Sequence, residues 1–541
     1  MPDINSRESA AGLSGVGSAG GVVRSDSASR SNQHQHAPSL AGRLIIGTLF
    51  AMVVLAISVV TVFRYTAPYL QADGVGQAMM SVQDVDLFFW GQNRFASVVA
   101  FLASPVANPM LNLFLCLLIN AVAYHALLVV VSWMGVHLVA GRRNWQCTLL
   151  LFLVLTAVTH TIVTDEKLYS LTLESQPFAL SWTLALGSFL LWKRREWWAF
   201  VLAAAMVGLA VGLNQSTVLI AAFLAVFEMV RRRQWVRWPI LGVAWILWLG
   251  VWATLASWYG GNAGPILDPE PAYFGIHPGL FASGFPQSFA TIAAGLRPVR
   301  IVALVLVGCV ATLLIGTQRR PALLSGLAMT ILYCTLFWLV FTGNAWVSAN
   351  GFNIRYFFPV VLGLILVLAV PLAAALLRLP DFLRAPGGLW WPTAVTAVLC
   401  VGPLVGPLTP PAQSTALLAT RATADYARAN DVAFLSGYFW PMWPIELQTL
   451  DGGRTSTYVT AAKSGGDPAA YQEALDRELA ESDGPPRAMC VDEEISVCVT
   501  YLEYWTRPGW QEVPGDCPVP ISNPLNGSPP VQACRLLEFR P

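Results

Sequence analysis

Residues 357–377 read FFPVVLGLILVLAVPLAAALL, an unbroken run without a charged side chain. A helix of about 20 such residues is long enough to cross the roughly 30 Å hydrocarbon layer of a bilayer. The whole chain has the same character: of 541 residues, 55% are hydrophobic and 12% are charged, and the mean hydropathy is +0.56. This balance lies outside that of soluble domains, so the sequence predicts an integral membrane protein.

Similar apolar runs recur along the chain, and we expect a polytopic α-helical membrane protein with about eleven transmembrane helices. Two short runs near Asn214 could instead form one re-entrant hairpin. The expected spans are Leu44–Phe63, Met110–Val131, Cys147–Val163, Phe178–Trp192, Trp197–Leu213, Ser216–Val230, Pro239–Trp258, Ile301–Ile315, Ala322–Phe341, Phe357–Leu377 and Trp390–Leu408.

Basic residues predict the orientation of these spans, because cytoplasmic loops are enriched in Lys and Arg. Every second connection is basic, and we assign that side as cytoplasmic. The basic residues are Arg24, Arg30, Arg43, Arg142, Arg143, Lys193, Arg194, Arg195, Arg231, Arg232, Arg233, Arg237, Arg319, Arg320, Arg378 and Arg384. An odd number of spans then places the N-terminus in the cytoplasm and the C-terminus outside. We expect the protein to lie in the inner (cytoplasmic) membrane of the cell.

Composition also divides the chain into three regions. Residues 1–42 are rich in Ser, Gly, Ala and Gln and are expected to be a disordered cytoplasmic tail. Residues 43–409 form the membrane domain, with an outer loop at 64–109 whose second half, Leu87–Ala103, is predicted as a helix along the membrane interface. Another outer loop, Tyr259–Arg300, is rich in Gly and Pro and is expected to be irregular. Residues 410–541 are predicted as a small extracytoplasmic α/β domain.

The pattern within the last region predicts individual elements. Short apolar runs at 432–438, 456–461, 488–491 and 535–539 favour strands, and 467–482 has helical spacing. This region also holds Cys490, Cys498, Cys517 and Cys534, and four cysteines in an oxidising compartment suggest two disulfide bonds. The simplest of the three pairings joins Cys490 to Cys498 and Cys517 to Cys534, although four thiols could alternatively bind zinc.

The candidate for chemistry is the sequence Gln83-Asp84-Val85-Asp86, which is followed at once by aromatic residues. Carboxylates at a membrane boundary are costly to place there and therefore suggest function. Asp84 and Asp86 could act as a general base, or could bind a divalent metal ion such as Mg²⁺ or Mn²⁺. The alternative is that one aspartate caps the interfacial helix and the other is solvated.

Five further residues are candidates for substrate binding. Arg94 and Arg355 lie near the outer membrane surface, where a guanidinium can contact phosphate or anchor in lipid headgroups. Glu174 is the acid of the second outer loop that lies nearest the membrane. Trp90 and Tyr356 fit an interfacial aromatic belt, with sugar stacking as a second role.

Several function classes are disfavoured. The net charge of +1 and the lack of a basic segment interleaved with aromatics argue against a nucleic-acid partner. We find no Walker motif, His-Glu-x-x-His zinc motif or Gly-x-Ser-x-Gly motif, which argues against ATP-driven and common hydrolytic chemistry.

An acidic motif in the first outer loop, an interfacial helix, many spans and an outer C-terminal domain together resemble the GT-C superfamily of membrane glycosyltransferases. The resemblance covers Leu44–Leu408. The superfamily includes protein O-mannosyltransferases and aminoarabinose transferases. It implies inverting transfer of a sugar from a polyprenyl-phosphate donor to an extracytoplasmic glycan, lipid or protein. It assigns the base or metal ligands to Asp84 and Asp86, and phosphate contact to Arg355. This chain has Asp-Val-Asp where the O-mannosyltransferases have Asp-Glu. A transporter or flippase of a lipid-linked saccharide, or a non-catalytic scaffold for envelope assembly, is the alternative.

Overall fold

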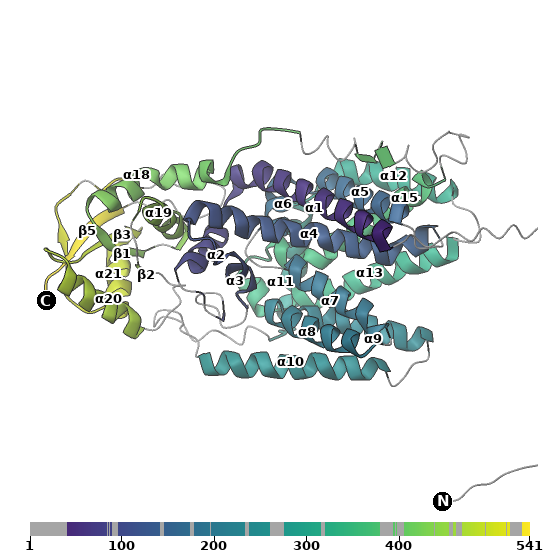
Figure 1. Cartoon of the computed structure of the whole chain (residues 1–541), viewed down its shortest axis with the longest axis horizontal. Coiled ribbons are helices and arrows are strands. Elements are labelled where there is room, and N and C mark those ends of the chain that lie inside the picture. Colours follow the sequence, from purple (N-terminus) through teal and green to yellow (C-terminus); the bar gives the residue numbers. More distant parts are fainter. Residues whose placement is uncertain are drawn as a thin grey trace, which may run out of the picture. The chain divides into compact units, whose positions relative to one another are not determined.

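The structure is a computed structural model of the whole chain (Figure 1). The residues that it describes are 40–83, 85, 87–88, 96–140, 145–173, 178–194, 196–232, 237–259, 275–314, 320–378, 393–394, 396–397, 405–437, 439–453, 458–460, 468–492, 494–515, 517–519 and 533–541. The chain divides into two compact units, Met1–Thr48 and Leu49–Pro541, and the sites below all lie in the second unit.

Ten of the expected spans correspond to helices, because an apolar segment in lipid must satisfy its backbone hydrogen bonds internally. These helices are α1 (Leu40–Tyr69), α4 (Pro109–Ala140), α5 (Trp145–Ile162), α7 (Phe178–Trp192), α8 (Trp197–Leu213), α9 (Thr217–Arg232), α10 (Arg237–Tyr259), α12 (Pro298–Leu314), α13 (Arg320–Thr342) and α15 (Phe358–Leu376). The expected span Trp390–Leu408 lies mostly outside the described residues.

Length and composition qualify fewer of these helices as membrane spans. Six described segments are long and apolar enough to cross a bilayer, and they belong to α1, α4, α5, α10, α13 and to η1 with α15. The other four apolar helices are shorter. The protein is therefore a multi-helix membrane protein, while a count of eleven transmembrane helices is not established.

Three expectations for the outer segments need correction. The loop 64–109 is partly helical: α1 continues to Tyr69, and α2 (Ala72–Val82) follows. Of the interfacial helix expected at Leu87–Ala103, only α3 (Val98–Ala103) is helical among the described residues, and Phe88 pairs with Ala96 as in an antiparallel bridge. The segment Tyr259–Arg300 contains α11 (Leu280–Ala294) in spite of its Gly and Pro content.

Short helices also follow α5 and α13. They are α6 (Asp165–Thr172), α14 (Ala345–Ala349) and the 3-10 helix η1 (Ile354–Phe357). Backbone bonds join these segments to one another: Thr164 N donates to Gly295 O at 3.0 Å, and His277 N donates to Gly343 O at 2.8 Å. The helix ends that the basic residues predict to share the outer side therefore contact one another.

The last part of the chain, coloured green to yellow in Figure 1, forms a five-stranded sheet with helices. The strands are β1 (Val432–Gly437), β2 (Tyr458–Thr460), β3 (Arg487–Asp492), β4 (Trp510–Val513) and β5 (Ala533–Phe539), and the helices are α18 (Thr415–Ala429), α19 (Phe439–Asp451), α20 (Pro468–Glu481) and α21 (Ile495–Trp505), preceded by η2 (Pro411–Gln413). The strand order is β2-β1-β3-β5-β4. Strand β1 is parallel to β2 and β3, while β5 is antiparallel to β3 and β4.

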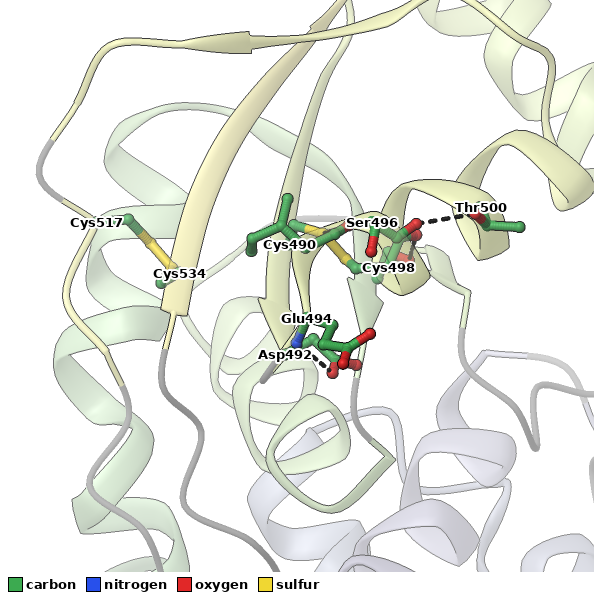
Figure 2. The surroundings of a disulfide bond; sticks show 10 residues. Cys490, Asp492, Glu494, Ser496, Cys498, Thr500, Cys517 and Cys534 are labelled. Carbon is green, nitrogen blue, oxygen red and sulfur yellow. Dashed lines mark hydrogen bonds between the residues drawn. A yellow bond between two sulfur atoms is a disulfide. The ribbon is translucent and has the colours of Figure 1, made fainter.

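Two disulfide bonds stabilise this domain (Figure 2). Cys490 of β3 is bonded to Cys498 of α21, and Cys517 is bonded to Cys534 of β5. This is the simplest of the three pairings that the sequence allowed. Because all four sulfur atoms are in disulfides, they do not form the alternative zinc site.

Candidate functional site

Several residues that the sequence selected lie outside the described residues: Asp84, Asp86, Trp90, Arg94 and Glu174. The residues on either side of the segment 89–95, which contains Trp90 and Arg94, are described. Ser97 N donates to Leu87 O at 3.0 Å, and Phe88 is paired with Ala96, so the two ends of the segment between them are close together. The roles proposed for the acids and for Trp90 and Arg94 stay predictions.

The buried helix α2 brings an acidic residue to Arg355 that sequence reasoning missed. Nη1 of Arg355 lies 2.9 Å from Oδ2 of Asp73, and the two side chains are 10% and 8% exposed. Asp73 stands in the first turn of α2, where a carboxylate also interacts favourably with the helix dipole. The sequence separation is 282 residues, so no local pattern could have indicated this ion pair.

Local structure around Arg355 holds the guanidinium in place. The side chain of Asn353 caps η1 by accepting a hydrogen bond from Arg355 N at 3.1 Å. Nη2 of Arg355 donates to the hydroxyl of Tyr356 at 3.3 Å. Tyr356 is itself buried, at 3% exposure, so it braces Arg355 from within the mouth of the bundle.

A second charged cluster joins α1, α6 and the start of α12. Nη2 of Arg297 lies 2.7 Å from Oδ1 of Asp165, and Nη2 of Arg64 lies 3.6 Å from Oδ2 of the same carboxylate. These three side chains are between 24% and 32% exposed. Two guanidinium groups thus share one carboxylate, which leaves the cluster with a net positive charge.

The guanidinium of Arg64 is partly covered by the chain. The Nε atom of Arg64 is buried and has no hydrogen-bond partner among the described residues. The backbone at Gly406 covers the guanidinium so closely that a Cβ at this position would lie 2.8 Å from Cζ and Nε of Arg64. The side chain as a whole is 24% exposed, so a ligand oxygen would have to approach Arg64 at its Nη atoms.

Packing brings the elements of the two charged clusters together. Gly295, two residues before Arg297, leaves room for the side chains of Ile354 and Lys167. Ile354 precedes Arg355 in the chain, and Lys167 lies in the first turn of α6 with Asp165. The hydroxyl of Tyr169 in α6 accepts a hydrogen bond from Gln71 N, next to α2, at 3.2 Å. The elements α2, α6, η1 and the start of α12 are therefore neighbours, and we refer to Arg64, Asp73, Asp165, Arg297 and Arg355 together as the charged mouth.

The histidines and Asn120 make polar contacts within the helix bundle. Nδ1 of His160 lies 2.9 Å from the hydroxyl of Tyr65, and Nδ1 of His125 lies 3.0 Å from Ser58 Oγ. Asn120 donates to Gln77 Oε1 at 3.1 Å. His125 and Asn120 thus make hydrogen bonds between helices.

No metal-binding group is found within the described part of the chain. Those residues contain no set of three or more His, Cys, Asp or Glu side chains that could hold an ion. The two aspartates that were expected to bind a divalent metal lie outside it, so no metal ligand can be named from the described geometry.

Solved structures that are similar to this chain include two of low sequence identity. A crystal structure of ArnT from Cupriavidus metallidurans bound to undecaprenyl phosphate has 12% identity and a TM-score of 0.47, over 92% of this chain and 98% of that chain. A cryo-electron-microscopy structure of arabinosyltransferase EmbB from Mycobacterium smegmatis has 15% identity and a TM-score of 0.32, over 61% of this chain and 30% of that chain. No protein-family model and no curated protein matches the sequence.

Proposed function

We propose that the protein is a membrane-embedded glycosyltransferase of the GT-C type. It transfers a sugar from a polyprenyl-phosphate donor to an extracytoplasmic acceptor, which is a glycan, lipid or protein of the cell envelope. The observation that carries this proposal is the charged mouth, where Arg355 and the Arg64–Asp165–Arg297 cluster gather at the ends of apolar helices. A site of this kind can bind a phosphate headgroup while the carrier chain remains in lipid.

The proposed reaction inverts the configuration of the sugar. The carboxylate of Asp84 or Asp86 removes the proton from the acceptor hydroxyl, and the hydroxyl oxygen attacks the anomeric carbon from the side opposite the phosphate. The bond between that carbon and the phosphate oxygen breaks, and polyprenyl phosphate leaves with the electron pair. No proton is needed by the leaving phosphate, because guanidinium groups stabilise its charge.

The arginines have distinct proposed roles. Arg64 and Arg297 bind the phosphate, because they are partly exposed and share a single carboxylate. Arg355 is buried and held by Asp73, so it supplies a fixed positive charge at the rear of the mouth. Arg94, Glu174 and Trp90 are proposed to contact the donor or acceptor, and Tyr356 acts through Arg355.

A divalent ion, Mg²⁺ or Mn²⁺, remains part of the proposal only at Asp84 and Asp86. Two carboxylates two residues apart supply the oxygen ligands that such ions prefer, and a bound ion would neutralise phosphate charge. The proposed transfer reaction itself uses protein side chains alone. A loss of transfer in EDTA that Mg²⁺ or Mn²⁺ restores would support the metal.

The second candidate function is transport of a lipid-linked saccharide. Transporters generally place charged residues near the middle of the membrane. Within the described part of the membrane domain, the ion pairs instead involve residues at helix ends and in the outer segments. This distribution favours chemistry at the membrane surface over transport through the helix bundle. A non-catalytic scaffold for envelope assembly would not need the charged mouth.

Purified protein in detergent micelles, incubated with a polyprenyl-phosphate sugar and a glycan acceptor, tests the proposal. We expect a covalent product in the absence of any vesicle gradient. Asp84→Asn or Asp86→Asn should lower the rate at least about 100-fold, as expected for loss of a general base. The control is Asp483→Asn, because Asp483 is an exposed acid of the C-terminal domain.

The outcomes separate the candidates. Full transfer by both Asp84→Asn and Asp86→Asn would overturn the role of the acidic loop. Movement of the saccharide across vesicles without a covalent product would support transport instead. Reporter fusions after Arg143 and Pro411 test the orientation, and reporters in the same compartment would contradict it.

A further inference from the structure

A buried carboxyl group on the C-terminal domain contacts the membrane domain. Glu446 lies in the middle of α19 and has no exposed surface. Its Oε1 accepts a hydrogen bond from Nε2 of Gln83 at 2.8 Å, across 363 residues of sequence. Oε2 of Glu446 has no hydrogen-bond partner among the described residues. A charged carboxylate in this position would be costly in free energy, because burial removes it from water.

Burial decides the charge of this group. Removal from water raises the pKa of Glu446 well above its ordinary value of 4.5, and the bond from Gln83 offsets only part of that effect. Burial therefore favours the protonated form of Glu446. In that form, Oε1 accepts from Gln83 and the proton lies on Oε2. A glutamine at this position would keep the accepting oxygen and the neutral charge.

Gln83 connects this contact to the charged mouth through α2. It is the C-terminal cap of α2, and its backbone N–H donates to Met79 O at 3.0 Å. Asp73, the partner of Arg355, stands in the first turn of the same helix. The two residues are ten apart, which corresponds to about 15 Å along an α-helix. One short helix therefore has the ion pair at one end and the bond to Glu446 at the other.

The surroundings make α2 a rigid connection. Residues Ala72–Ser81 are all buried. The helix packs against both α4 of the membrane domain and α19 of the C-terminal domain. A second bond ties it to α4, where Asn120 donates to Gln77 Oε1. A displacement of Gln83 would therefore be transmitted along the helix to Asp73.

We propose that Glu446 is a positioning residue through which the C-terminal domain sets the geometry of the donor-binding mouth. By holding Gln83, Glu446 fixes α2, and α2 places Asp73 against Arg355. This inference rests on the proposed function for its consequence in donor binding, because Arg355 there supplies a fixed positive charge to the phosphate site. The link between the two domains does not depend on that function.

The first experiment compares three variants in the transfer assay. Glu446→Leu and Gln83→Leu remove the hydrogen bond, and each should raise the KM for the polyprenyl-phosphate donor about 5–10-fold, with a smaller change in kcat. Glu446→Gln should restore the KM to within about twofold of the parent protein. Asp451→Asn, an exposed acid at the end of the same helix, is the matched control.

A second measurement gives an answer without catalysis. Hydrogen–deuterium exchange of the α2 amides should be faster in Glu446→Leu and Gln83→Leu than in the parent, and it should be normal in Glu446→Gln. In the exchanged pair Gln83→Glu with Glu446→Gln, the amide at 446 can donate to the carboxyl at 83. Exchange in α2 should then be slower than in Gln83→Leu.

Each outcome has one meaning. Unchanged α2 exchange in Glu446→Leu would overturn the inference, whatever the activity. Equal defects in Glu446→Gln and Glu446→Leu would also overturn it, because the glutamine retains the acceptor. Altered exchange with no transfer by the parent protein would contradict the proposed function and leave the link between the domains supported.

Discussion

Two buried acids, Asp73 and Glu446, are connected to opposite ends of α2 and are stabilised in opposite ways. Asp73 faces the guanidinium of Arg355 at 2.9 Å in an ion pair. Glu446 accepts a hydrogen bond from the neutral amide of Gln83, and burial favours its protonated form by raising its pKa. The charged pair lies beside the proposed phosphate site, and the neutral pair lies between the domains. Each kind of pair matches the role that is proposed for it. The first provides an electrostatic field, and the second provides a connection.

The comparison also predicts different sensitivities. Removing one partner of a buried ion pair leaves an uncompensated charge, which costs about 3–5 kcal/mol. Removing one partner of a neutral hydrogen bond costs about 1–3 kcal/mol. Asp73 should therefore depend on its partner more strongly than Glu446 does.

Arg355→Met should give the largest effect. It leaves Asp73 buried without a counter-charge, so we expect a loss of about 3–5 kcal/mol in stability and a large fall in apparent Tm in detergent. Arg355→Lys keeps the positive charge but loses the planar guanidinium, so its stability should lie between that of the parent and that of Arg355→Met. The double variant Asp73→Asn with Arg355→Met removes both charges and should recover part of the loss. A single variant as stable as its parent would show that the ion pair is not a stabilising contact.

The pH dependence of Glu446→Gln should give the next effect. A raised pKa in the folded protein means that the folded state binds more protons than the unfolded state above about pH 4.5. Stability from the neutral acid is therefore complete below that pH and is lost as pH rises toward the folded pKa, by up to about 1.4 kcal/mol per pH unit. The glutamine of Glu446→Gln does not titrate, so its stability should not fall in this way. The apparent Tm of Glu446→Gln should therefore rise relative to that of the parent as pH increases.

Apparent Tm measured for both proteins at pH 5, 6, 7 and 8 checks this prediction. The neighbour of Glu446 on α2, Gln83, does not titrate. A titratable group that interacts electrostatically with Glu446 is Tyr471 of α20, whose hydroxyl donates to Val459 O at 3.1 Å. Tyr471→Phe is the control, because it removes that hydroxyl and leaves the acid in place. Parallel Tm curves for Glu446→Gln and its parent would mean that Glu446 is not held neutral.

The sequence predicted the elements that local chemistry determines. Ten apolar spans matched helices, because a chain in lipid can form little else, and β1 was evident as a short buried run. Strand β4 was missed, because Trp510–Val513 alternates weakly and pairs only with β5. The two disulfides needed the fold, since four cysteines allow three pairings.

The site was harder to predict, because its contacts are long-range. Helix α2 contains two glycines and an aspartate, which have low helix propensity, and it is helical because it is buried against α4 and α19. Arg355 could be selected from its place beside a span. Its partner Asp73 and the bond between Gln83 and Glu446 join residues several hundred positions apart, and no spacing in the sequence indicates them.

Asp165 provides an intermediate case that sharpens the comparison. It is an ionic partner like Asp73, but it is 32% exposed and has two guanidinium neighbours, Arg297 at 2.7 Å and Arg64 at 3.6 Å. Arg297→Gln should therefore lower stability by no more than about 1 kcal/mol, since water screens the pair and Arg64 remains.

The same Arg297→Gln variant should weaken binding of the polyprenyl-phosphate donor about tenfold, because the mouth loses one of its two exposed positive charges and gains no other donor of that strength. Apparent Tm and donor KM, measured on one preparation, separate the two effects. Arg300→Gln is the matched control, since Arg300 is exposed and donates to the backbone oxygen of Thr161. A fall in stability as large as that of Arg355→Met, with donor KM unchanged, would mean that the Arg64–Asp165–Arg297 cluster is structural. The phosphate site would then have to be sought at Arg355 alone.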